Sequence, residues 1–251
     1  MIAKLLTEKI KPMKGFSHIF HIMLVATLPV ALFILVRLEF TVLAFLLLLL
    51  SKWRIFAVRT RYWLANIRLS LVDMLFGAGI ILAMMSANSM STQLVWLVVY
   101  LVWLLYIKPG SSKLMVALQA VLAQGLFLAT FTDRYSHFHS FILVIVFWFV
   151  AYFSARHFLG GFDEEKPGLL ASIWGLFAAQ LAWVSSHWLV FFGSLAQPVV
   201  LLTAISVGIA SLYYLEKEDR LSTFAQKQII FSTLFIIIII IVLSDWGDKT
   251  I

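Results

Sequence analysis

Asp73 is the one carboxylate that lies well inside a long apolar segment of this sequence. A charged side chain within a membrane span is costly, so an intramembrane acid is a functional candidate by default. We therefore take Asp73 as the candidate catalytic or ion-coupling residue. Two structural roles compete with this interpretation, because Asp73 lies only about one turn from the end of its segment. It could pair with a nearby arginine or reach the membrane surface, and structural pairing is the simpler explanation.

Basic and aromatic residues recur with helical spacing in residues 53–68, just before the segment of Asp73. Taken as a helix, this stretch carries arginines every seven residues beside a stripe of tryptophans. Tryptophan favours the boundary between acyl chains and head groups, and arginine binds phosphate with two parallel hydrogen bonds. The pattern predicts an interfacial amphipathic helix that binds a lipid phosphate, or one that only sets orientation. The candidate residues are Arg54, Arg61, Arg68, Trp53 and Trp63.

Two other groups could supply metal ligands. Asp163, Glu164 and Glu165 offer carboxylate oxygens that could hold Mg²⁺ against a substrate phosphate, although a solvated turn is the simpler explanation. On the opposite side of the membrane, His137, His139 and His187 could bind zinc or copper, or could simply be interfacial histidines. The chain has no cysteine, which removes thiolate ligands and nucleophiles. We predict no cofactor, except Mg²⁺ if the protein is an enzyme acting on a phosphorylated lipid.

Glutamines are the notable polar side chains within the remaining apolar segments, at Gln119, Gln124 and Gln180. Buried glutamines hydrogen-bond between membrane helices, and small residues at four-residue spacing, such as Ala171, Gly175 and Ala179, let helices approach closely. Packing explains these positions. The alternative is a pathway for a small, mainly neutral solute that passes the three glutamines.

The order of these elements resembles that of UbiA-type intramembrane prenyltransferases, which have nine helices and functional cytoplasmic loops after the second and sixth. In that family both loops carry Asp-rich motifs that bind Mg²⁺ and diphosphate. Here the sixth loop offers Asp163, Glu164 and Glu165, and the earlier region offers Asn66 and Asp73. The paired aspartates of the family's first motif are absent, so the resemblance is one of layout.

The amino-acid composition of the chain indicates a membrane protein. The chain of 251 residues is 63% hydrophobic and only 12% charged, whereas a soluble domain is about a quarter charged. We predict an all-α integral membrane bundle with nine transmembrane helices, or eight if 40–51 does not cross. It forms a single domain over 1–251, with a short basic segment at 1–15 and no soluble domain. The predicted spans are Phe16–Val36, Phe40–Ser51, Leu69–Ala87, Gln93–Ile107, Leu114–Thr130, His139–His157, Gly168–Ser185, Ser194–Leu215 and Gln228–Ser244.

The distribution of positive charge predicts the orientation. With nine spans, sixteen of the nineteen Lys and Arg residues fall on the side of the N-terminus. Cytoplasmic loops carry such an excess, so we expect the N-terminus inside and the C-terminus outside. The multi-pass chain is expected in a cell inner (plasma) membrane. The pI near 9.7 is then explained by loops that face anionic lipid head groups rather than by nucleic acid.

These observations favour a non-enzymatic membrane subunit or lipid-interacting scaffold, because each polar group within the membrane has an adequate structural explanation. Two alternatives remain: an intramembrane enzyme acting on a phosphorylated (prenyl or phospho-) lipid at the cytoplasmic face, and a transporter of a small neutral solute. The expected partners are membrane lipids and either another membrane protein or a second copy of the chain.

Overall fold

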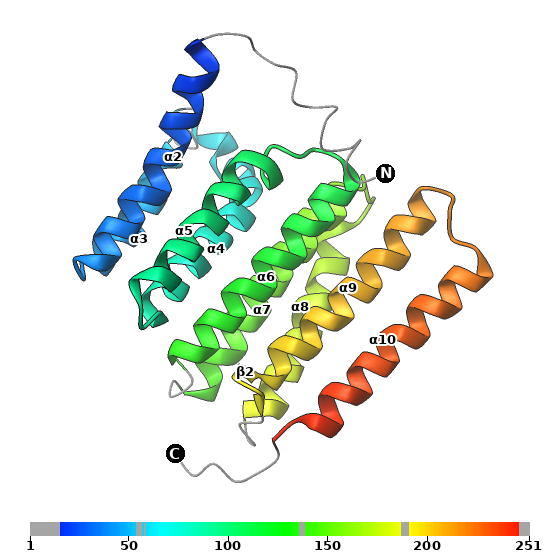
Figure 1. The fold of residues 1–251 in the computed structure, drawn as a ribbon. Helices are drawn as coiled ribbons and strands as arrows, with labels where there is room; N and C mark the ends of the chain where they lie inside the picture. Colours follow the sequence, from blue (N-terminus) through cyan, green and yellow to red (C-terminus); the bar gives the residue numbers. More distant parts are fainter. Residues whose placement is uncertain (1–15, 54–56, 58, 136–138, 187–190, 246–251) are drawn as a thin grey trace.

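The computed structural model describes residues 16–53, 57, 59–135, 139–186 and 191–245, which form a bundle of helices (Figure 1). The helical elements are α2 (Phe16–Arg37), α3 (Thr41–Leu50), η2 (Thr60–Tyr62), α4 (Trp63–Ser86), α5 (Met90–Val102), η3 (Trp103–Ile107), α6 (Lys113–Tyr135), α7 (Ser140–Gly160), α8 (Pro167–Ser186), α9 (Gln197–Lys217) and α10 (Thr223–Leu243). A two-residue hairpin, β1 (Phe191–Phe192) with β2 (Leu195–Ala196), precedes α9.

Seven helical segments within the described residues are long and apolar enough to cross a membrane. They are α4 and every later α-helix, with α5 and the π-helical turn η3 counted as one segment. The predicted all-α membrane class is therefore supported by the structure, and these seven spans correspond to the last seven predicted from the sequence. Two shorter apolar helices come first, Ile22–Arg37 within α2 and the ten-residue α3, so the count of nine stays a prediction.

Several predicted boundaries need correction, among them the start of the last span, which lies at Thr223 rather than Gln228, and the two regions described next. Residues 53–68 do not form one interfacial helix, because 60–62 form the 3₁₀ turn η2 and residues 63–68 are the first turns of α4. Residues 54–56 and 58 of that stretch lie outside the described part of the chain. The eighth predicted span begins at Gln197 rather than Ser194, because the residues just before it turn back as the β1–β2 hairpin around Gly193 at φ 62°.

Helix α4 is the most buried of the long segments, because 61% of its apolar stretch is buried inside the protein. It contacts α2, α3, α5, α6 and α7. Its glycines make this crowding feasible. A Cβ on Gly77 would lie 2.7 Å from the Leu48 side chain of α3 and 2.9 Å from the Tyr100 hydroxyl of α5. Only glycine gives the room for three helices to meet at this level.

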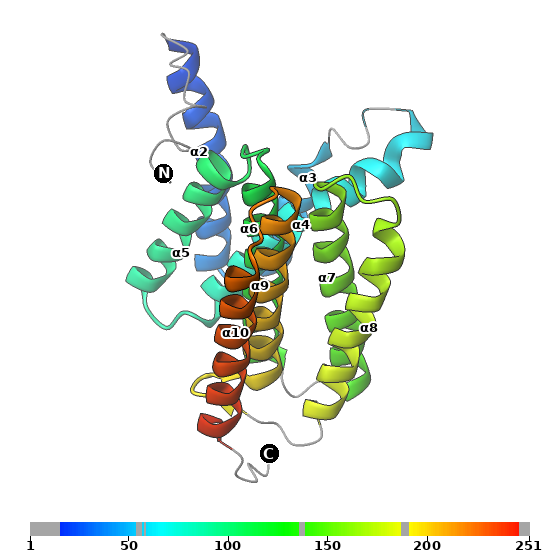
Figure 2. The same ribbon diagram turned by 90° about the vertical axis from the view of Figure 1, so that its right-hand side faces the viewer.

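Helices α7 and α8 form the closest pair in the bundle and lie side by side at one edge of it (Figure 2). The face of α8 that meets α7 is a line of small buried residues: Ala171, Gly175, Ala178 and Ala182. The predicted seam of small residues is thus correct for its first two members. Ala179 is only half-buried, because helical periodicity places Ala178 on the buried face instead.

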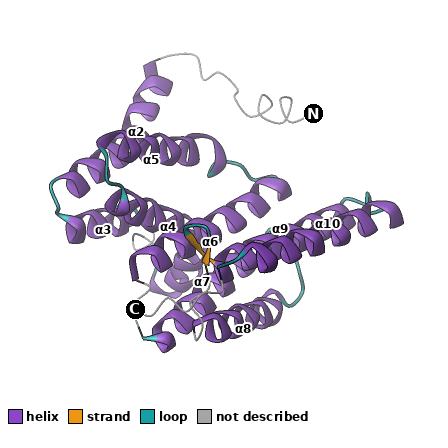
Figure 3. Ribbon diagram, turned by 60° about the horizontal axis from the view of Figure 1, so that its bottom comes forward, coloured by secondary structure: helices purple, strands orange, loops and turns teal. Residues whose placement is uncertain are grey.

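Helix α10 is the most exposed of the long segments, because only 6% of its apolar stretch is buried. It lies against α9 at the outer edge of the molecule (Figure 3). The isoleucine-rich stretch of α10 therefore presents apolar side chains outward, as expected for a surface that contacts lipid.

Basic loops gather at one end of the bundle, and ion pairs connect them. Lys113, before α6, lies 3.1 Å from Glu218 after α9, and Lys217 lies 2.7 Å from Glu164 in the α7–α8 turn. Lys52 and Lys108, which follow α3 and η3, both pair with Asp73 of α4. The described parts of the loops that the nine-span prediction assigns to one side thus lie at one end of the structure (Figure 1).

Candidate functional site

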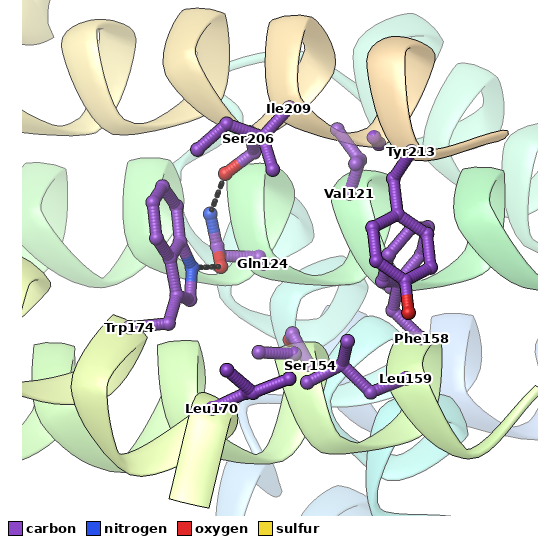
Figure 4. Close-up of a pocket in the computed structure, with 13 residues that line it drawn as sticks. Val121, Gln124, Ser154, Phe158, Leu159, Leu170, Trp174, Ser206, Ile209 and Tyr213 are labelled. Atoms are coloured by element: carbon purple, nitrogen blue, oxygen red, sulfur yellow. Dashed lines mark hydrogen bonds between the residues drawn. The ribbon is translucent and has the colours of Figure 1, made fainter. Parts of the chain in front are cut away.

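A cavity of about 240 Å³ lies between α6, α7, α8 and α9. Its walls are mostly apolar, and they include small side chains from three helices: Ala120 of α6, Ala155 of α7 and Ala210 of α9. These alanines leave the space open, because a larger residue at any of them would project into it. The cavity begins near the middle of α6 and extends toward the basic end of the bundle, where Phe158 and Tyr213 line it (Figure 4).

Gln124 of α6 is the polar centre of this cavity (Figure 4). Its amide nitrogen donates to the Ser206 hydroxyl at 2.8 Å, and its amide oxygen accepts from the Trp174 indole N–H at 3.3 Å. These bonds fix the amide between α8 and α9. They use one of its two N–H donors and one of the two lone pairs of its oxygen. One N–H donor and one lone pair of the amide therefore remain for a further partner.

Ser154 of α7 lines the same cavity and is only 2% exposed, and its hydroxyl has no hydrogen-bond partner within the described residues. Serines in membrane helices usually bond to a carbonyl one turn earlier, as Ser206 does to Leu202 at 2.7 Å. Leaving a buried hydroxyl without a partner costs about 1–3 kcal/mol. The Ser154 hydroxyl is thus a buried polar group without a described partner, on a residue that lines the cavity.

We infer that the cavity opens between α8 and α9, because its exposed lining residues come from these two helices, which touch each other much less than α7 and α8 do. Leu170 of α8 and Ile209 of α9 flank this opening and are 40% and 47% exposed. At the level of these residues a membrane-embedded bundle faces acyl chains.

At the basic end of the cavity, Tyr213 donates its hydroxyl hydrogen to Glu164, which also pairs with Lys217. These hydrogen bonds, that from Lys217 above all, hold the pKa of the Glu164 carboxyl below its usual range. Phe158, Phe162 and Tyr213 pack with tilted or edge-to-face rings beside this group, with ring centroids 4.7–5.4 Å apart. Together they close the cavity toward the membrane surface.

Asp73 belongs to a separate cluster of charged residues outside this cavity. Both Lys52 and Lys108 approach its Oδ2 atom, Lys108 at 2.7 Å, and the Trp103 indole N–H donates to Oδ1 at 2.8 Å. The Trp103 ring is itself stacked on Phe76 at 3.7 Å. Asp73 therefore has the structural pairing that the sequence favours, but with two lysines in place of the predicted arginine.

The three glutamines have different roles. Gln124 lines the cavity, whereas the amide nitrogen of Gln119 donates to the carbonyls of Ile107, Lys108 and Gly110 at 2.7–3.3 Å, and its Oε1 accepts from His157 Nε2 at 3.0 Å. Gln119 thus fastens the turn between η3 and α6. Gln180 is exposed on α8 and does not line the cavity. Of the proposed solute-path residues, only Gln124 meets an open space there.

The remaining candidates from the sequence are dispersed. Trp53, Arg61 and Arg68 are exposed and Trp63 is half-buried, while Asp163 and Glu165 are exposed and only Glu164 of that run forms an ion pair. His139 caps the start of α7, accepting from the Phe141 N–H at 3.5 Å. Arg54, His137 and His187 lie outside the described residues. In the part of the chain that the structure describes, no three acidic or histidine side chains gather as metal ligands would.

Sequence reasoning missed Lys52 and Lys108 at the Asp73 cluster, and Ser154, Trp174 and Ser206 at the cavity. The lysines were visible only as loop charges, and their convergence on one carboxylate depends on how three segments pack. Serine and tryptophan within an apolar segment give no signal by themselves, because both are common in membrane helices. Comparison with known proteins adds no assignment: no protein-family model, no curated protein and no solved structure matches this chain.

Proposed function

We propose that this chain is a non-enzymatic multi-pass membrane protein that binds a small neutral amphiphile, taken up from the bilayer, in the α6–α9 cavity. The ligand has an apolar body and one carbonyl or hydroxyl group that hydrogen-bonds to Gln124 and Ser154. The observation that carries the proposal is the Ser154 hydroxyl, which is buried, has no partner within the described residues and lines the same cavity as Gln124.

The lining of the cavity supports a neutral ligand. It includes no carboxylate, histidine, lysine or arginine, so an ionised group placed there would be desolvated without a counter-charge. The same composition favours binding over catalysis, because no side chain that commonly transfers protons at neutral pH lines the space. A cavity of about 150 Å³ holds benzene. The 240 Å³ present here accommodates on the order of ten non-hydrogen atoms, either a whole small molecule or one end of a lipid.

The proposal keeps the lipid-interacting, non-enzymatic part of the sequence interpretation. An enzyme acting on a phosphorylated lipid would use Asp73 and the acidic loop together, but Asp73 pairs with Lys52 and Lys108 whereas Glu164 pairs with Lys217 and Tyr213. We further propose that the basic end of the bundle faces the cytoplasm of a cell whose inner membrane holds the protein, with the N-terminus inside.

A carrier is the second candidate, because the cavity reaches Gln124 near the middle of α6. A transported solute needs a site near the bilayer midplane, and Gln124 lies eleven residues, about 16 Å, into its helix. Measuring uptake of the bound compound into sealed vesicles separates the two proposals. A carrier moves the compound across the bilayer, whereas a binding protein only retains it.

The test is native mass spectrometry of the protein purified in lipid nanodiscs, with ligand occupancy compared between variants. Ser154→Ala removes one hydrogen bond to the ligand and should weaken binding about two- to tenfold. Ala155→Trp fills the cavity and should abolish binding. Ser172→Ala is the matched control, because Ser172 donates to the Gly168 carbonyl within α8 and does not line the cavity.

The outcomes distinguish loss of ligand binding from loss of folding. Ser154→Ala should fold at least as well as the parent chain without ligand, because it removes an unpaired buried hydroxyl. If Ser154→Ala and Ser172→Ala bind equally, Ser154 does not contact the ligand. If a folded Ala155→Trp variant retains the same bound molecule, the cavity is not its site and the proposal is wrong.

A further inference from the structure

The Asp73 cluster has one more positive charge than it can neutralise. Lys52 and Lys108 come from different connections and approach the same Oδ2 atom of Asp73, while Trp103 occupies Oδ1. Both carboxylate oxygens are therefore engaged. Each ammonium has three N–H donors and directs one of them at Asp73, so both lysines keep donors for another acceptor.

Part of this cluster is withdrawn from water. The side chains of Lys52 and Asp73 are 10% and 11% exposed, whereas that of Lys108 is 42% exposed. The other ion-paired carboxylates at this end of the described structure are engaged elsewhere, Glu164 by Lys217 and Glu218 by Lys113. Two ammoniums beside one buried carboxylate form a site with net positive charge, and an external anion would balance it.

The position of the cluster indicates where such an anion comes from. Lys108 directly follows Ile107, the last residue of an apolar segment, and is the most accessible member of the cluster. Trp53, which is next to Lys52 in sequence, is 62% exposed. Lysine near the end of a membrane helix and an exposed tryptophan both belong at the level of the head groups.

We propose that Lys52 and Lys108, held side by side by Asp73, bind a phosphate group at the membrane surface. This site is independent of the α6–α9 cavity and of the ligand proposed for it. Asp73 acts as the positioning residue, because it holds both ammoniums on one oxygen, and the phosphate oxygens accept the hydrogens that Asp73 leaves free. The phosphate belongs either to an anionic lipid or to a free ion, and the chemistry of recognition is the same for both.

The experiment compares Lys108→Gln with Lys113→Gln in nanodiscs of phosphatidylcholine alone and of phosphatidylcholine with phosphatidylglycerol. Lys113 is a matched control, because it follows Lys108 closely in the chain, its side chain is also 42% exposed, and it forms a balanced pair with Glu218. Native mass spectrometry counts the phosphatidylglycerol molecules that stay bound. A third arm adds inorganic phosphate to the protein in phosphatidylcholine discs and measures the shift in thermal unfolding temperature.

We expect Lys108→Gln to weaken retention of phosphatidylglycerol about fivefold, and Lys113→Gln to leave it unchanged, since one lysine near a charged surface contributes about that factor. Lys108→Gln should still fold, because the balanced Lys52–Asp73 pair remains. Retention of lipid without a phosphate shift identifies a lipid head group, and a phosphate shift lost in Lys108→Gln identifies a free ion. Equal losses in both variants, or no effect of either anion on the parent protein, would overturn the site.

Discussion

Replacing Asp73 by asparagine should be the most damaging single change of charge in this protein. Asparagine has nearly the shape of aspartate and its carbonyl oxygen can still accept from the Trp103 indole. The substitution therefore isolates the charge. It leaves Lys52 and Lys108 facing each other without a counter-ion, and the side chain of Lys52 is only 10% exposed.

The expected magnitude follows from this burial. Breaking a buried ion pair by removing one partner costs about 3–5 kcal/mol, because the remaining charge stays desolvated. Removing Lys108 instead leaves one lysine and one carboxylate, and Lys108 is 42% exposed. That change should alter the free energy of unfolding by less than about 1 kcal/mol, as for an exposed pair. The two substitutions affect the same cluster, yet we expect effects that differ severalfold.

The assay is reversible unfolding in mixed micelles or bicelles, with the Trp fluorescence of parent and variants compared. The double variant Lys52→Met with Asp73→Asn should recover most of the stability, because no buried ammonium then remains beside the neutral amide. The control pair Lys113→Gln and Glu218→Gln should change little. Equal effects of Asp73→Asn and Lys108→Gln, or a loss below about 1 kcal/mol for Asp73→Asn, would refute the reasoning that the two lysines depend on this carboxylate.

Two further predictions concern the basic end and the path of the chain. Hydrogen bonds from Lys217 and a tyrosine hydroxyl lower the pKa of Glu164. The stabilisation that they give is therefore present above the ordinary glutamate pKa and is lost as pH falls through the lowered pKa. We expect Glu164→Gln to remove this acid dependence of the unfolding temperature, and Glu165→Gln to keep it. The chain has no cysteine, so single cysteines at Glu39 and Arg220 can be probed with a membrane-impermeant maleimide, and we expect labelling from opposite sides. Labelling of both from one side would contradict the proposed nine-span topology.

The long helices could be predicted from the sequence because a membrane span has a physical minimum length. About 20 apolar residues are needed to cross, and seven such runs in the chain coincide with seven long helical segments of the structure. The boundaries moved by a few residues where local backbone geometry intervened. Gly193 turns the chain into a hairpin, so α9 begins at Gln197 and not at Ser194.

The sites could be predicted only in part. Asp73 was recognisable as an intramembrane acid, but its partners depend on the fold. The seven-residue spacing of arginines assumed one continuous helix before α4, and η2 interrupts it, so Arg61 and Arg68 lie exposed while Lys52 reaches Asp73. The cavity exists because alanines on three separate helices face one space, which no local pattern records.

The short α3 and the buried acid of α4 explain each other. Ten residues of α-helix span about 15 Å, half of the hydrocarbon thickness, so α3 is shorter than a full span. Lys52 follows at once, and its side chain is only 10% exposed, so its ammonium needs a counter-ion within the protein. Asp73 lies ten residues into α4, about 15 Å along that helix, where it meets the Lys52 ammonium. An acid that looks catalytic in the sequence therefore neutralises the lysine that follows the short helix, and the second lysine on the same carboxylate is the part of this cluster that this pairing does not explain.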